Sequence, residues 1–175
     1  MISLPREKAW EKWDEFWNEA NKEFFKVEDI QDYTAEDNDQ KSSLHLWLDG
    51  HKRASIDTIY RNKSEWAEQT SSKDIRKIRV HVVDEPYTEY LKWEIEHYKI
   101  VNIPLGKERT FLVNRKDVPN YVLGDFMMFD DRDVTKSHYS LEGRMESMDI
   151  YENESIEKFI TAKAQLMQFA KEIIV

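Results

Sequence analysis

The sequence of 175 residues contains no cysteine and has only four glycines and four prolines. Without cysteine the chain has no disulfide, no thiolate nucleophile and no cysteine-based zinc site. The glycines are scattered, which excludes a glycine-rich loop that cradles phosphate. No apolar run approaches the length of a membrane span, and no signal-peptide pattern is present. We therefore expect a cytoplasmic protein that does not insert into a membrane.

What the chain does contain is typical of a packed domain. Hydrophobic residues make up 40% of the sequence and aromatic residues 13%, and charged residues of both signs reach 35%. The net charge of −9 argues against non-specific binding to nucleic acid or anionic lipid. Locally basic runs at 51–53 and 73–79 fit a solvated surface, so we expect no direct contact with nucleic acid.

An aromatic stripe dominates the first segment. Trp10, Trp13 and Trp17 recur at steps of three and four and predict one amphipathic helix over residues 5–30. The stripe either packs on the domain's own core or forms a surface for a partner helix. Two shorter helices are predicted over 42–48 and 55–69.

From residue 75 onward the pattern changes to alternation. We expect a single domain, with a helical part at 1–72 and a sheet with helices at 73–175. The predicted fold class is α+β: a helical N-terminal part, then β-α-β-β-β-α, with a mixed or antiparallel sheet of about four strands. The predicted strands are 78–83, 109–114, 125–129 and 134–139, residues 144–151 also alternate, and the predicted helices are 86–98 and 154–174. The last three strands are close enough in sequence to form an antiparallel meander, and only the β-α-β crossover could be parallel.

Two motifs resemble a known family. The first is the run Arg-Val-His-Val-Val-Asp-Glu-Pro-Tyr-Thr-Glu-Tyr at 79–90, and the second is Asp-Phe-Met-Met-Phe-Asp-Asp-Arg at 125–132. Both resemble the uncharacterised, mainly actinobacterial domain-of-unknown-function family 6879 (DUF6879), often encoded beside helix-turn-helix regulators. His81 stands where the family usually has Arg. The resemblance implies a regulatory or conflict-related role with a protein partner such as a helix-turn-helix regulator, and it supplies no catalytic residue.

Several side chains are candidates for a binding site. Glu94 lies on the inward face of the predicted helix at 86–98, and Arg79 on the preceding strand is its expected partner. This pair is either a core ion pair or part of a pocket with a perturbed acid. His138 and Tyr139 end one strand, and they complete a predicted cluster with Arg79, Glu94 and Asp130.

Three further candidates, Glu85, Tyr90 and Arg132, come from the two motifs. Around Arg132, three aspartates at 130, 131 and 133 could hold a hard cation, but Asp is also a standard turn residue. We favour a hairpin turn, and we expect neither a metal site nor a cofactor.

The sequence leaves three functional hypotheses. The leading one is a non-enzymatic regulatory or interaction module. The alternative is a small-ligand-binding or enzymatic domain with a pocket at Arg79, Glu94, Asp130, His138 and Tyr139. A third is an acidic decoy for a nucleic-acid-binding protein, which requires one contiguous acidic surface. The sequence does not indicate an oligomeric state.

Overall fold

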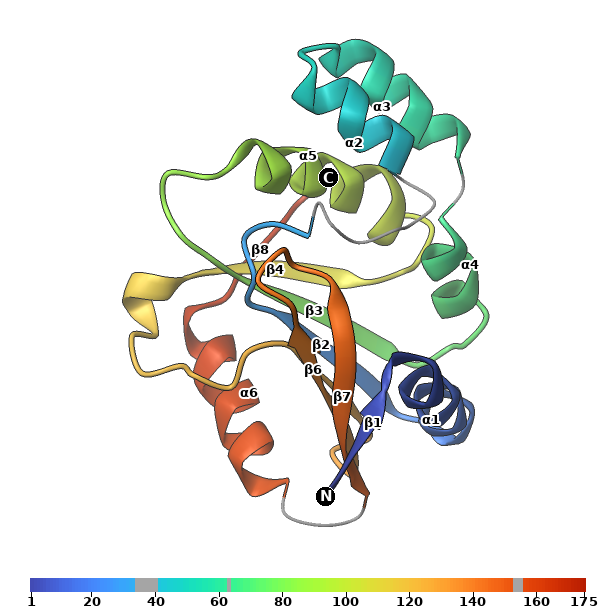
Figure 1. Cartoon of the computed structure of the whole chain (residues 1–175), viewed down its shortest axis with the longest axis vertical. Coiled ribbons are helices and arrows are strands. Elements are labelled where there is room, and N and C mark those ends of the chain that lie inside the picture. Colours follow the sequence, from blue (N-terminus) through green and yellow to red (C-terminus); the bar gives the residue numbers. More distant parts are fainter. Residues whose placement is uncertain (34–40, 63, 153–155) are drawn as a thin grey trace.

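A computed structural model of the chain describes residues 1–33, 41–62, 64–152 and 156–175. Its centre is one mixed eight-stranded sheet with helices on both faces (Figure 1). The strands are β1 (Ile2–Pro5), β2 (Glu23–Glu28), β3 (Arg76–Val83), β4 (Arg109–Asn114), β5 (Phe126–Phe129), β6 (Asp133–Tyr139), β7 (Met145–Glu152) and β8 (Lys171–Glu172). The helices are α1 (Arg6–Glu19), α2 (Lys41–Leu48), α3 (Lys52–Arg61), α4 (Glu65–Ser71), α5 (Glu89–His97) and α6 (Glu157–Phe169).

The α+β class is confirmed, but the expected number of about four strands is wrong. The strand order is β1-β7-β6-β5-β2-β3-β4-β8. β2, β3 and β4 are parallel neighbours, and the other pairs are antiparallel. The expected parallel crossover through α5 and the expected β5-β6-β7 meander are both present. The missed strands are β1, β2 and β8, of which β1 and β2 lie in the part of the chain that was expected to be helical.

β2 is the most consequential of these differences. The predicted helix over 5–30 ends at Glu19, and the chain turns directly into a strand between β5 and β3. Nearly every residue of β2 is buried on one face or the other, as in a central strand. The turn before it is held by the Asp130 carboxylate, which accepts the backbone N–H groups of Asn21, Lys22 and Glu23. Because Asp130 is more than 100 residues away in sequence, no local pattern could reveal this turn.

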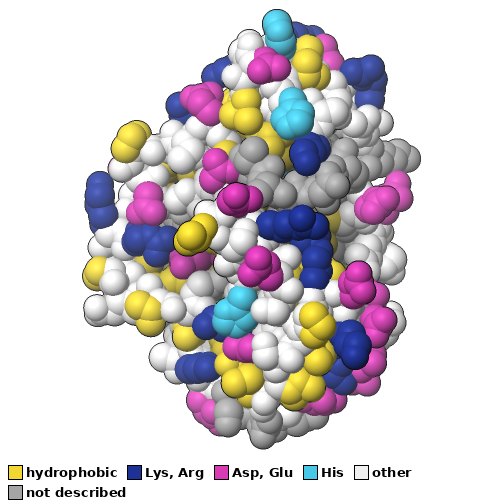
Figure 2. All heavy atoms as spheres, viewed as in Figure 1, with side chains coloured by type: hydrophobic (Ala, Val, Ile, Leu, Met, Phe, Trp, Pro, Cys, Tyr) yellow, Lys and Arg dark blue, Asp and Glu magenta, His cyan; other side chains and the backbone are white. Residues whose placement is uncertain are grey.

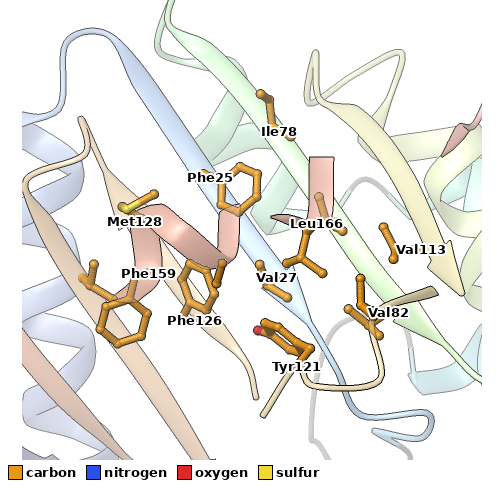
Figure 3. Packing of buried hydrophobic residues seen from close by; sticks show 14 of the residues in the cluster. Phe25, Val27, Ile78, Val82, Val113, Tyr121, Phe126, Met128, Phe159 and Leu166 are labelled. Atoms are coloured by element: carbon orange, nitrogen blue, oxygen red, sulfur yellow. The ribbon is translucent and has the colours of Figure 1, made fainter. Parts of the chain in front are cut away.

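α6 covers one face of the sheet and encloses an apolar core (Figure 3). Phe25 and Val27 of β2 point to this side together with Val82 of β3 and Phe126 of β5. Phe159 of α6 packs against Phe126 with ring centroids 5.0 Å apart. The alternate residues of the same strands therefore face the opposite side, where α1, α4 and α5 lie.

The tryptophan stripe of α1 is packed on the second face. Trp13 and Trp17 are buried and stack with centroids 5.5 Å apart, and Trp13 Nε1 donates to the Met127 sulfur at 3.1 Å. Trp10 is half-buried beside them. The stripe is thus core, and its interpretation as a partner surface is wrong for Trp13 and Trp17.

The remaining helices differ from expectation mainly at their ends. The predicted helix over 55–69 is two helices, α3 and α4, and Ser64 caps α4. α5 begins at Glu89 with Thr88 as N-cap, rather than at Pro86, and continues into a π-helical turn at Tyr98–Asn102. α2 and α3 pack over α5 at one end of the molecule (Figure 1).

Two surface properties bear on function. On the face in Figure 2, acidic and basic side chains are interspersed, which gives no support to an acidic decoy. Among the helices of the described residues, none combines the length and apolarity that a membrane crossing requires.

Candidate functional site

A pocket of about 300 Å³ lies on the second face of the sheet, beneath α1, α4 and α5. Its base consists of β2, β3, β5 and β6, and α5 supplies one wall. Polar and aromatic side chains dominate the lining, which includes Trp10, Lys26, Glu28, Tyr33, Trp66, Arg79, Tyr90, Trp93, Glu94, Tyr98, Asp125 and Tyr139.

Strand register arranges the charged groups of the base. Lys26 of β2 pairs with Arg79 of the parallel strand β3, and Glu28 pairs with His81 two residues further on. Side chains two residues apart share a face, so these four residues project to the same side. They lie toward the carboxyl ends of the parallel strands, where open sheets of this kind commonly bind ligands.

Glu28 is the centre of the buried network. Its carboxylate accepts Arg79 Nη1 at 2.5 Å and the Tyr98 hydroxyl at 2.6 Å, and Lys26 Nζ lies 2.8 Å away. Burial alone would raise the pKa of Glu28, but the Arg79 guanidinium and the Lys26 ammonium hold it well below its usual value. Glu28 is therefore ionised.

Arg79 is shared between two acids, and neither is the one expected. Its Nε donates to Glu108 at 2.8 Å while its Nη1 donates to Glu28. Burial opposes the charge, but Glu108 and Glu28 keep the pKa of Arg79 well above its usual value. Its guanidinium also lies 5.5 Å from the Trp66 ring. The predicted Arg79–Glu94 pairing is thus replaced by a bridge between Glu28 and Glu108.

The partner of Glu94 is His81, whose hydrogen bonds define its charge. The hydroxyl hydrogen of Tyr98 is directed to Glu28, so the 3.0 Å contact between this hydroxyl and His81 Nδ1 requires Nδ1 to donate. Nε2 lies 3.0 Å from the Ile30 carbonyl oxygen, which can only accept. Both ring nitrogens therefore carry hydrogen. Although burial alone would lower the pKa of His81, Glu94 and Glu28 raise it to about 9.

Glu28, His81 and Glu94 also place three metal-type ligand atoms within 4.8 Å of one another. A metal ion would need a ring nitrogen with a free lone pair. Because both nitrogens of His81 donate hydrogen bonds, an imidazolium occupies the position between the two carboxylates that a cation would otherwise take.

Two buried polar atoms of α5 have no hydrogen-bond partner among the described residues. Glu94 Oε2 is 3.3 Å from His81 Nδ1, but the hydrogen on that nitrogen points to Tyr98. Within the described residues, Glu94 Oε2 and Trp93 Nε1 are buried and have no hydrogen-bond partner. A buried polar atom without a partner costs about 1–3 kcal/mol, and a ligand can remove that cost.

Asp125 lies at the same end of the pocket. Its carboxylate accepts the Tyr33 hydroxyl at 2.5 Å, the Tyr139 hydroxyl at 3.1 Å and the Asp29 backbone N–H at 2.8 Å. Burial raises the pKa of Asp125 to about 6, although the Tyr33 hydroxyl opposes the rise. The group sits at the boundary between its neutral and ionised forms in the physiological range.

The predicted cluster is only partly assembled. Arg79, Glu94 and Tyr139 line one pocket, and Tyr90 joins them. Asp130 is instead the cap of the turn before β2, within the predicted hairpin turn between β5 and β6.

His138, Glu85 and Arg132 also lie outside the pocket lining. His138 Nε2 pairs with Asp149 at 2.9 Å on a half-exposed side chain. Glu85 is exposed, and Arg132 pairs with Glu19 and Asp133 near the hairpin turn. His138 follows Ser137, which lines the pocket, and successive side chains of a strand point to opposite faces. Arg132 lies at the β5–β6 turn, at the other end of β6 from Tyr139.

Sequence reasoning missed Glu28, Tyr98, Glu108 and the role of Asp125 as candidate pocket residues. One signal was present: β3 alternates Lys77, Arg79 and His81 with Ile78, Val80 and Val82. Charges at every second position of a strand whose other face is apolar indicate either solvent or a buried polar network. Because β3 is a central strand of the sheet, its charged side chains form a buried polar network rather than a solvent-exposed face.

Fold and pocket together define an α+β domain with a preformed cavity lined by aromatic side chains and a few charged groups. A family model described as "Domain of unknown function (DUF6879)" matches residues 11–173, and the chain belongs to this family. The resemblance on the two motifs is thereby confirmed. No curated protein matches the sequence.

Among solved structures, the chain is similar to TrmBL2, an archaeal chromatin protein whose structure is described as showing a novel mode of DNA binding. The TM-score is 0.51 at 11% identity, over 98% of this chain and 52% of that one. The chain therefore spans about half the length of that protein, and the likeness shows the fold. It also corrects one expectation, because a fold shared with a DNA-binding protein does not permit nucleic acid to be dismissed as a partner on net charge alone.

Proposed function

We propose that this domain binds a small molecule in the pocket beneath α5, and that binding rather than chemical turnover is its function. The observation that carries the proposal is the cavity of about 300 Å³ with buried, open polar atoms on Glu94 and Trp93. Ligand sites are typically concave and mostly aromatic or apolar, with a few fixed polar groups. This pocket has that composition.

Binding is favoured over catalysis by the state of the buried histidine. A histidine that acts as a general base must hold an unprotonated nitrogen within reach of its substrate. His81 carries hydrogen on both nitrogens and is clamped by Glu28, Glu94 and Tyr98. A pre-paired network of this kind suits a rigid receptor. A regulatory role, as the family resemblance implies, would follow if ligand binding changed the exposure of the helices above the pocket.

The test is a fragment screen by protein-observed NMR on the full chain. We expect ligands to shift the amide signals of Tyr90, Glu94 and Tyr139 together. Ser137 lines the pocket, so Ser137→Phe should block these ligands. Lys136→Phe, the neighbouring position on the other face of β6, is the matched control. The proposal is wrong if no fragment perturbs the pocket, or if a folded Ser137→Phe variant binds every fragment unchanged.

A further inference from the structure

We propose that the tyrosine-rich end of the pocket binds an organic cation, a protonated amine or amidine on an apolar body, with Glu94 as its counter-ion. This inference rests on the proposed function and specifies its ligand. The tyrosine-rich end is defined here by Tyr33, Tyr90 and Tyr139, with Glu94 and Asp125 between them.

The charges at this end are the first argument. Lys26 and Arg79 are both engaged by Glu28, and Arg79 also by Glu108. His81 is the cation in contact with Glu94, and it also faces Glu28. The contacts that hold Asp125 are two tyrosine hydroxyls and a backbone N–H. Among the described residues, His81 is the one cation that contacts a carboxylate of this end, and it faces Glu94 and not Asp125. An added positive charge would therefore balance Glu94 and Asp125.

The Glu94 oxygen without a hydrogen bond indicates which kind of group the ligand carries. Glu94 is only 7% exposed, and its Oε2 accepts no hydrogen bond from the described residues. A carboxylate oxygen only accepts, so the group that completes it must carry an N–H or O–H. A charged donor makes a hydrogen bond roughly twice as strong as a neutral one. Glu94 therefore favours a protonated nitrogen.

The aromatic walls add a second preference. The Tyr33 ring lies 5.9 Å from that of Tyr90 and 5.5 Å from that of Tyr139, and Tyr90 lies 5.5 Å from Trp93. Ring faces attract cations, and the attraction grows when water is excluded. Among the residues that the structure describes, the cations near Glu94 and Asp125 are already paired with acids, so an anion would meet two carboxylates. A metal ion is disfavoured because His81 already donates from both nitrogens.

The experiment is a charge series on the wild-type chain at pH 7. Benzamidine, benzamide and benzoate have nearly the same shape and carry charges of about +1, 0 and −1. By calorimetry and NMR titration, we expect benzamidine to bind at least about tenfold more tightly than benzamide, with benzoate weaker still. The amide signals of Tyr90 and Glu94 should shift with benzamidine.

A pair of variants localises the effect. Glu94→Gln should reduce benzamidine affinity about tenfold or more and leave benzamide unchanged. Glu96→Gln, on the same helix with its carboxylate half-exposed and paired with Lys99, is the matched control and should bind as wild type. If Glu94→Gln does not fold, the relative affinities of the wild-type chain for benzamidine, benzamide and benzoate still test the inference.

Several outcomes would overturn the inference. Equal or tighter binding of benzamide or benzoate would refute a cation site while leaving a pocket ligand in place. The same holds if fragments occupy the pocket and benzamidine does not. Binding of Zn²⁺ or Mn²⁺ that His81→Asn abolishes would assign the three-residue cluster to a metal instead. A pocket that takes no fragment at all would refute the proposed function itself.

Discussion

Stability should fall as pH rises from neutral to alkaline, because His81 is buried as an imidazolium. Its pKa is about 9 in the folded chain against 6.5 for an ordinary histidine. Between these two values the folded state binds more protons than the unfolded state, so unfolding becomes easier with rising pH. At about 1.4 kcal/mol per pH unit, the loss of unfolding free energy is about 3 kcal/mol. This loss of unfolding free energy begins at about pH 6.5 and is complete above about pH 9.

Among the described residues, the groups that face His81 are Glu28 on β2, Glu94 and Tyr98 on or after α5, the Tyr33 ring and the Ile30 carbonyl. Burial and Asp125 keep the pKa of Tyr33 well above its ordinary value. Burial and Glu28 keep the pKa of Tyr98 well above its ordinary value, so this tyrosine does not titrate in the same window. The slope between pH 6.5 and 9 is therefore assigned to His81.

Urea denaturation at steps of half a pH unit measures the slope. His81→Arg, which places the residue usual for the family, keeps a positive charge at every pH in this range and should flatten the curve. His81→Asn should also be flat, but less stable at pH 6.5, since two buried carboxylates lose their cation. A wild-type curve with no change between pH 6.5 and 9 would show that the ring is neutral and that the hydrogen-bond assignment is wrong.

Three further predictions concern other parts of the fold. Trp13→Ala should lower the unfolding free energy by about 3–5 kcal/mol, whereas Ala at the exposed Tyr60 should change it by less than about 0.5, both by urea denaturation. Asp125, with its pKa raised from 3.8 to about 6, makes folding less favourable as pH rises through that range. The unfolding free energy of Asp125→Asn, measured relative to that of wild type, should therefore rise by about 3 kcal/mol between pH 4 and 7. The titration of the wild-type carboxyl group is followed by ¹³C NMR. Asp130→Ala removes three charged hydrogen bonds to the turn before β2 and should cost about 2 kcal/mol, of which Asp130→Asn should restore part, again by urea denaturation. Asn tolerates the positive φ of this position and Ala does not, so equal loss in both variants would show that the carboxylate charge, rather than the backbone conformation, matters.

The sequence predicted those elements whose pattern is local. The strand at 78–83, the helix after it and the β5-β6-β7 meander follow from alternation, capping residues and turn residues, and all are present. β2 could not be predicted in this way. Phe24 and Val27 continue the three- and four-residue spacing of the tryptophans, and no glycine or proline interrupts the run. What ends α1 is a carboxylate from a distant hairpin, which becomes visible only when the chain is folded.

The candidate site shows the same limit. Glu94 was identified from its position on an amphipathic helix, but its partner depends on which residue of β3 lies opposite it. Arg79 and His81 share a face, and the choice between them is made by Glu28, a residue of the strand that was read as a helix. The wrong secondary structure predicted for β2 therefore led to the wrong partner predicted for Glu94. Asp130 and His138 failed for different reasons: Asp130 lies at the turn before β6, at the far end of that strand from Tyr139, and His138 points to the face of β6 opposite to that of Ser137.

The buried network itself is an argument for a receptor. Paired charges in a core are seldom more stable than apolar residues of similar volume, because desolvation offsets their attraction. Glu108, Arg79, Glu28, His81 and Glu94 nevertheless form a continuous series of alternating sign beneath the pocket. Each member contacts the next, and the last atom of the series, Glu94 Oε2, lies 3.3 Å from His81 Nδ1 but accepts no hydrogen bond from the described residues. A chain of ion pairs that ends in an acceptor without a hydrogen bond gains little for the fold, but it holds a charge in a single position beside the cavity.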